Sequence, residues 1–162
     1  MKTNLFLFVL SLVFTSCIAQ EKFDPKSTPV AKIEGDAIVL TVEEEIIANS
    51  VKAANDDVMN VLNIRVEKTN EFSYLLFETV TESKTIPYAI RLVPIKSGSP
   101  KLLATGTTHS CTGHCCESCT FTKTGSGEIT GCWCQRAAIT PGCQTEARCD
   151  HSLSMSSGGI LE

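Results

Sequence analysis

The sequence predicts an α+β fold: one helix packed on a small antiparallel sheet of about four strands, followed by a disulfide-rich C-terminal appendage. Three observations support this prediction. Apolar residues recur at helical spacing between Ile47 and Val58. From Leu62 onward they recur at every second position, as in half-buried strands. Eight of the nine cysteines lie between Cys111 and Cys149, in a stretch with few other apolar residues.

Residues 1–16 are predicted to be a signal peptide. Lys2 gives a basic start, an apolar run extends from Leu5 to Phe14, and small residues follow. The run is too short to span a bilayer as a helix, which needs roughly 17 to 25 residues. The protein is therefore expected to be exported.

The end of this leader, Phe14-Thr15-Ser16-Cys17, resembles the lipobox of bacterial lipoproteins, although leucine is commoner than Phe14 at its first position. The resemblance implies that Cys17 receives a diacylglycerol, that cleavage precedes it and that the new amine is acylated. The lipid would hold the protein on a membrane of the bacterial cell envelope, facing the periplasm or the cell surface. The alternative is ordinary cleavage after Ala19 and secretion.

Residues 17–29 are predicted to be a tether between this anchor and the folded part. The stretch from Glu21 to Pro29 carries two prolines and four charges, which indicates an extended segment. An irregular segment lying against the domain is the alternative.

The α+β module is predicted to span residues 30–106 and to begin with a strand at Ala37–Leu40. A helix should follow, because Thr41 and Glu44 fit a capping box. Its apolar residues step at four, three and four positions, which places them on one face. They are Ile47, Val51, Ala54 and Val58.

Three strands are predicted after the helix, within residues 62–66, 72–80 and 86–92, and residues 102–105 could add a fourth. The order of strand, helix and consecutive strands is similar to that of the cystatins. The similarity is one of topology only, because the chain lacks both the Gln-x-Val-x-Gly loop and the Pro-Trp hairpin of that family. It implies a protease inhibitor as one alternative function.

Residues 107–152 are predicted to be a cysteine-rich segment held together by disulfides, and residues 153–162 a flexible tail. Ordering each residue costs roughly 1–2 kcal/mol of backbone entropy. The few apolar residues of this segment bury too little area to offset that cost. Each disulfide contributes about 2–4 kcal/mol. Setting Cys17 aside leaves an even number of cysteines, as expected of an exported disulfide framework. The predicted disulfide cysteines are Cys111, Cys115, Cys116, Cys119, Cys132, Cys134, Cys143 and Cys149.

The connectivity stays open, apart from two local expectations. A hairpin that turns at residues 124–127 should bring Cys119 near Cys132. Cys115 and Cys116 should have different partners, because a ring between neighbours is strained.

A zinc or copper site is the alternative interpretation of the same segment. The spacing C-x2-C-x12-C-x-C resembles a zinc-ribbon knuckle pair, except that a ribbon closes with C-x2-C. Metal ligation needs thiolates, which an oxidising compartment removes, so disulfides are favoured and no cofactor is predicted. Otherwise the histidines are expected to be exposed loop residues. The candidate ligands are Cys116, Cys119, Cys132, Cys134, His109 and His114.

These observations predict a non-enzymatic envelope protein whose appendage contacts an unidentified protein or glycan. No catalytic residues are predicted, because catalytic motifs such as G-x-S-x-G and H-E-x-x-H are missing. The net charge of −4 and the lack of a basic cluster exclude nucleic acid as a partner. Trp133 is a candidate contact residue, and its packing against the module is the alternative. A periplasmic metal-binding or redox protein is the second functional hypothesis.

Overall fold

A computed structural model describes residues 27–137, 143 and 147–155. The predicted signal peptide, the lipidation candidate Cys17 and most of the tether lie outside these residues. Strand β9 (Arg148–Met155) includes the first residues of the predicted tail, and the rest of the tail is again outside.

The fold is mostly β, so the predicted α+β class is wrong. The described residues form nine strands and one helix, α1 (Glu44–Ala54), and every strand pairing is antiparallel. The remaining strands are β1 (Ala31–Glu34), β2 (Ala37–Leu40), β3 (Asn60–Lys68), β4 (Ser73–Val80), β5 (Thr85–Pro94), β6 (Lys101–His114), β7 (Cys116–Lys123) and β8 (Ile129–Ala137).

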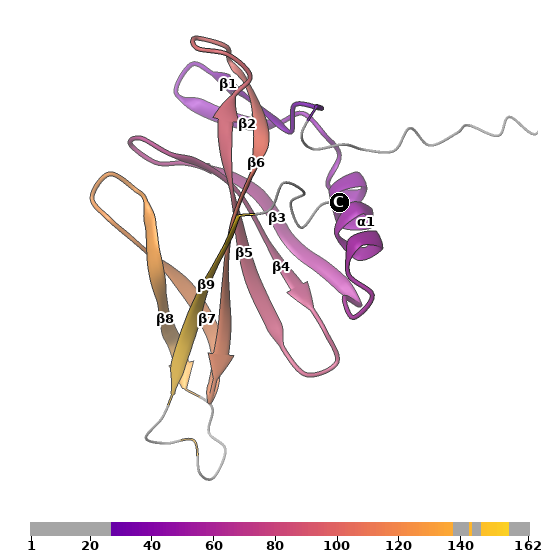
Figure 1. The fold of residues 1–162 in the computed structure, drawn as a ribbon, viewed down its shortest axis with the longest axis vertical. Helices are drawn as coiled ribbons and strands as arrows, with labels where there is room; N and C mark the ends of the chain where they lie inside the picture. Colours follow the sequence, from indigo (N-terminus) through magenta and orange to yellow (C-terminus); the bar gives the residue numbers. More distant parts are fainter. Residues whose placement is uncertain (1–26, 138–142, 144–146, 156–162) are drawn as a thin grey trace, which may run out of the picture.

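Seven strands form one sheet in the order β2-β1-β6-β5-β4-β3, with β9 added alongside β6 (Figure 1). The sheet curls until its edge strands, β2 and β3, come into contact, so that it is nearly closed. Strands β7 and β8 form a separate hairpin (Figure 1).

The long strand β6 joins the predicted module to the predicted appendage. Its first residues pair with β1, through Ala31 and Leu102, and its second half pairs with β9 from Thr107 to His114. The boundary predicted between residues 106 and 107 therefore lies inside a continuous strand. This half of β6 and its partner β9 contain few large apolar residues, so their apolar alternation is too weak to predict strands.

The main core lies between the sheet and α1. Ile47 and Val51 of the helix are fully buried there, as its apolar periodicity predicts, and they join Leu75, Phe77 and Ile90 of the sheet. Burial of this apolar face stabilises the helix more than its intrinsic propensity does.

The predicted capping box does not form. Glu43 occupies the N-cap position without a side-chain cap, and the Thr41 hydroxyl instead donates a 2.7 Å hydrogen bond to the Pro29 carbonyl. This hydrogen bond joins the segment that precedes α1 to the segment that precedes β1.

Candidate functional site

The hairpin β7–β8 lies on the face of the sheet opposite to α1. Ile129 and Phe121 of the hairpin pack on Tyr74, Leu76 and Ala89 in a second, smaller core. The Tyr74 hydroxyl accepts a 3.2 Å hydrogen bond from the Ile129 backbone N–H in this buried contact. Burial raises the pKa of Tyr74, so its hydroxyl stays protonated at neutral pH.

The tip of the hairpin is held by the turn between β3 and β4. The Asn70 side-chain amide donates to the Gly125 carbonyl at 2.9 Å, and the Glu71 N–H donates to the Ser126 carbonyl at 3.1 Å. Gly127 has a φ of +94°, and a Cβ at this position would overlap the side chain of Thr69. Glycine is therefore required both by the turn and by the close contact.

All eight predicted cysteines are joined in four disulfides, which confirms the prediction of a disulfide-rich region. Cys111–Cys132 ties the hairpin to β6, and Cys119–Cys149 ties it to β9. Cys116–Cys134 closes the hairpin across its own strands. Cys115–Cys143 joins the corner between β6 and β7 to a residue that lies between β8 and β9 in the sequence.

The local expectations for the connectivity were only partly correct. Cys115 and Cys116 do have different partners. Cys119, however, faces Cys134 across the hairpin and not Cys132, because irregularities in the β7–β8 register shift the pairing. Its disulfide runs to Cys149, on a strand that the sequence analysis did not predict.

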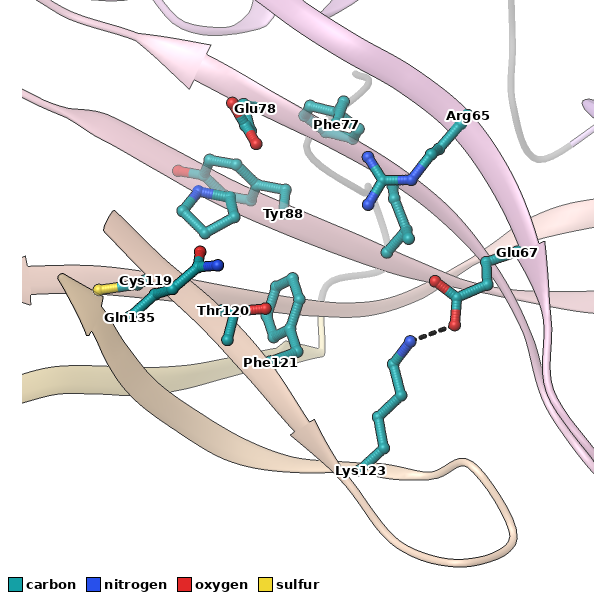
Figure 2. A pocket seen from close by; sticks show the side chains of 12 residues that line it. Arg65, Glu67, Phe77, Glu78, Tyr88, Cys119, Thr120, Phe121, Lys123 and Gln135 are labelled. Atoms are coloured by element: carbon teal, nitrogen blue, oxygen red, sulfur yellow. Dashed lines mark hydrogen bonds and ion pairs between the residues drawn. The ribbon is translucent and has the colours of Figure 1, made fainter. Parts of the chain in front are cut away.

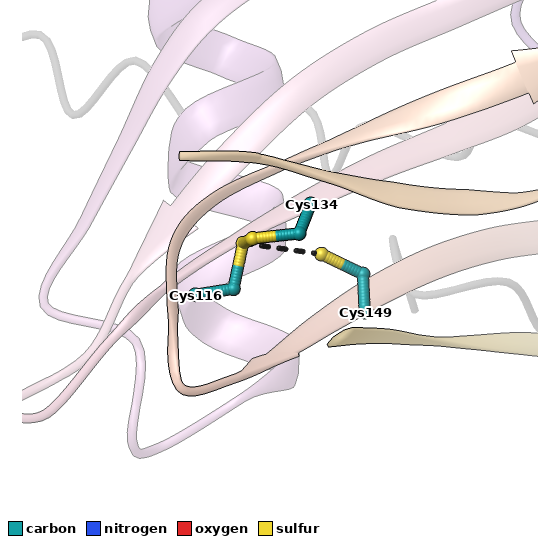
Figure 3. Close-up of side chains that lie close together, drawn as sticks. All are labelled: Cys116, Cys134 and Cys149. Carbon is teal, nitrogen blue, oxygen red and sulfur yellow. Dashed lines mark hydrogen bonds between the residues drawn. A yellow bond between two sulfur atoms is a disulfide. The ribbon is translucent and has the colours of Figure 1, made fainter. Parts of the chain in front are cut away.

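Two of the disulfides touch each other (Figure 3). The Sγ atom of Cys149 lies 3.5 Å from the Sγ atom of Cys116. Neither sulfur carries a proton, because both are oxidised, so this is a contact between two disulfides. Gly113 of β6 makes room for them, since a Cβ there would lie 2.7 Å from the Cys116 carbonyl oxygen and 3.4 Å from the Cys119 Sγ.

The predicted metal ligands do not assemble as the ribbon spacing suggests. Cys132 bonds to Cys111, whereas Cys134 bonds to Cys116. With every cysteine of the predicted set oxidised, no thiolate is present to hold zinc or copper in this form.

The histidines were expected to be exposed loop residues, and this was wrong for His109 and for His151, which is half-buried on β9. His109 lies on β6 with 7% of its surface exposed, and its Nδ1 is 3.1 Å from Nε2 of His151 on β9. The ring centroids are 5.3 Å apart and the ring planes are inclined by 16°. The two nitrogens share one hydrogen bond, and the tautomers of the rings decide which nitrogen donates it. His114 lies at the end of β6 and is exposed.

The environment of His109 favours its neutral form. Burial lowers the pKa of His109, and the adjacent His151 lowers it further, because a second positive charge would be close. Glu128 opposes the shift and Arg91 adds to it. The sequence carries no local signal for this buried position, because Thr108, which faces the other side of β6, is buried as well.

A groove of about 250 Å³ lies between the hairpin and strands β3 to β5 (Figure 2). Polar and charged side chains alternate in its lining with apolar and aromatic ones, among them Phe121, and an ion pair between Lys123 and Glu67 lies at one end. On the sheet side, Glu78 accepts a 2.9 Å hydrogen bond from the Asn63 side chain. The sequence analysis did not predict this groove, because it needs the hairpin docked on the sheet.

Trp133 is exposed over 53% of its surface. It lies on β8 between Cys132, which is bonded to β6, and Cys134, which is bonded to β7. This exposure favours the contact role over packing against the module.

No protein-family model, no curated protein and no solved structure matches this chain. The four disulfides indicate an oxidising, extracytoplasmic environment. Among the described residues, no helix has the length and apolar character that a membrane crossing needs. Fold and site together define an exported, mostly β protein with a disulfide-stapled hairpin. The protease-inhibitor alternative was inferred from the element order of an α+β module, and the observed fold removes that basis.

Proposed function

We propose that this protein is a non-enzymatic lipoprotein of the bacterial cell envelope that presents its stapled hairpin to another macromolecule. The leader and its lipobox-like end at Cys17 support the membrane anchor. The disulfide framework supports export, because such bonds persist outside the cytosol.

The exposure of Trp133 is the observation that carries the contact role. Tryptophan is strongly enriched among the residues that dominate binding energy at interfaces. Here the hairpin backbone is already ordered by disulfides and by its contacts with the sheet, so binding would cost little conformational entropy. A large exposed aromatic on a rigid support is suited to binding a partner that already has a defined surface.

The groove beside the hairpin offers a second set of contacts. Gln135, Thr120 and Arg65 supply hydrogen-bonding groups, and Phe121 supplies an aromatic face. Planar polar groups together with an aromatic ring suit either a peptide or a glycan chain. A protein or glycan of the envelope is therefore the proposed partner class.

A photoreactive amino acid at Gln135, an exposed residue of β8, tests the contact in growing cells. We expect a discrete crosslinked adduct that Trp133→Ala weakens about 30-fold, the effect of losing a hot-spot residue worth about 2 kcal/mol. Thr130→Ala, at another exposed position of β8, is the matched control and should leave the adduct intact. An adduct of equal yield in both variants, or none at all, contradicts the contact role.

Intact mass spectrometry of the protein from native membranes tests the anchor separately. The proposal expects a chain that begins at Cys17 and carries the mass of its acyl groups, and it expects Cys17→Ala to release the protein from the membrane. An unmodified chain that begins after Ala19 contradicts it.

A further inference from the structure

Four cysteine sulfurs gather where β7, β8 and β9 meet. The Sγ atoms of Cys116, Cys134 and Cys149 all lie within 4.8 Å of one another, and the Sγ of Cys119 is bonded to that of Cys149. Figure 3 shows the Cys116–Cys134 disulfide with the sulfur of Cys149 directed at it. Residues from three different strands thus bring their sulfurs to one point.

This spacing is close to that of a tetrahedral thiolate site. With Zn–S bonds of about 2.3 Å, neighbouring sulfurs of a zinc site are about 3.8 Å apart. Cys116 and Cys149, at 3.5 Å, are already near that separation. For all four sulfurs to surround one ion, the two bonded pairs have to separate and the Cys119 Sγ, which is not among the three sulfurs within 4.8 Å of one another, has to move toward Cys116 and Cys134.

The cluster is also more accessible than the disulfide that ties the hairpin to the sheet. Its four cysteines are half-buried, whereas Cys111 of the Cys111–Cys132 bond is fully buried. Under limited reduction a dithiol therefore opens the cluster before the Cys111–Cys132 bond, which still ties the hairpin to β6.

We propose that Cys116, Cys119, Cys134 and Cys149 form a latent tetrathiolate site for zinc, which is uncovered when both of their disulfides are reduced. Each disulfide takes two electrons and two protons from a dithiol, which is itself oxidised to a disulfide. The four thiols then bind one Zn²⁺ and release four protons. The metal would tie together the same three strands that the two disulfides tie in the oxidised form.

Cobalt titration of the full exported chain, after anaerobic reduction and removal of the reductant, tests the proposal. Co²⁺ reports on a zinc-type site through the visible spectrum of tetrahedral thiolate coordination. We expect one ion per chain with that spectrum, displaced by Zn²⁺, and no binding to the oxidised protein. A reduced protein without this spectrum overturns the proposal.

Two double variants identify the ligands, because each removes one disulfide and two thiols. Cys115→Ser/Cys143→Ser, outside the cluster, should bind Co²⁺ like the wild type. Cys116→Ser/Cys134→Ser should bind more than about 100-fold more weakly, since losing even an outer-shell contact costs roughly 10- to 100-fold. Equal affinity of the two variants overturns the proposal.

A donor exchange keeps the test valid if the Cys116→Ser/Cys134→Ser variant does not fold. Cys134→His retains a fourth ligand but replaces one sulfur with nitrogen, so the cobalt spectrum should shift to that of three thiolates and one imidazole. An unchanged spectrum would show that Cys134 is not a ligand and would overturn the proposal.

Discussion

The two faces of the sheet are covered in different ways. On the α1 side, twelve buried residues form one apolar cluster with no disulfide among them. On the hairpin side, only four residues are buried in the corresponding cluster, and the four disulfides lie in and around the hairpin that covers it. One face is held by packing and the other largely by covalent bonds.

The difference shows what each kind of stabilisation allows. A packed cover must turn its apolar side chains inward, as Ile47 and Val51 of α1 do. A stapled cover is held by a few sulfurs, so the hairpin can keep Trp133 exposed and leave a polar groove beneath its edge. Disulfides thus make residues available for contact that a packed element would have to bury.

Reduction of the disulfides is expected to have the largest effect, because it should destabilise the hairpin side of the sheet and leave the α1 side folded. Dithiothreitol together with a chelator removes bonds worth about 2–4 kcal/mol each, and the small core under the hairpin does not replace them. We expect the backbone amides of β7, β8 and β9 to lose their protection from hydrogen exchange, while those of β3, β4 and β5 keep it. The chelator is needed because bound zinc would otherwise substitute for two of the bonds.

The oxidised protein with chelator is the control for this measurement. If β7 to β9 remain as protected after reduction as before, packing alone holds the hairpin. The contrast between the two faces would then be wrong.

The second experiment disrupts the packed face. Phe77 is 1% exposed and stacks on Tyr88 at 5.4 Å between ring centroids. Phe77→Ala should lower the free energy of unfolding by about 3–5 kcal/mol, measured by denaturant titration of the oxidised protein. Leu62→Ala is the control, because Leu62 lies on the neighbouring strand with 42% of its surface exposed, and should change it by less than about 0.5 kcal/mol.

The four disulfides should not compensate for Phe77→Ala, since they lie on the other face. Equal losses for the two variants would mean that this apolar cluster contributes less to stability than its burial indicates.

Strands β3 to β5 and α1 could be predicted from the sequence because their side chains carry the signal. In β4 the two faces are both apolar, with Leu75 and Phe77 toward α1 and Tyr74 and Leu76 toward the hairpin, and aromatic residues of this kind favour a strand. The helical period marks Ile47 and Val51. The fold class could not be predicted, because β9 and half of β6 are strands through backbone pairing and through their anchored cysteines.

In the candidate site, too, some features could be predicted from the sequence and others could not. Cysteine number and spacing predicted the disulfides, and the turn at residues 124–127 predicted a hairpin. The contact between Cys116 and Cys149, and the pair of His109 and His151, depend on the register of β9 against β6. A register between distant segments leaves no local pattern in the sequence.

The smallest expected effect is a dependence of the free energy of unfolding on pH, which arises from His109, where β9 pairs with β6. Burial and His151 lower the pKa of His109 in the folded state, whereas the unfolded chain has an ordinary value near 6.5. Below about pH 6.5 the unfolded state therefore binds more protons, so stability is complete above that pH and falls as the pH decreases toward the lowered folded pKa. The slope can reach about 1.4 kcal/mol per pH unit from this one residue.

Denaturant titrations of the oxidised protein between pH 7.5 and pH 5, taken roughly as the range that brackets an ordinary histidine pKa, measure this slope. His109→Gln is the matched variant, because glutamine can still hydrogen-bond to His151 but does not titrate. We expect the variant to lose the fall in stability below pH 6.5, and hydrogen exchange should place the acid-sensitive opening in β9 and the hairpin. An equal fall in wild type and variant would assign the pH dependence to other groups. His109 would then be a buried side chain that packs against Tyr74 and does not make the stapled face sensitive to acid.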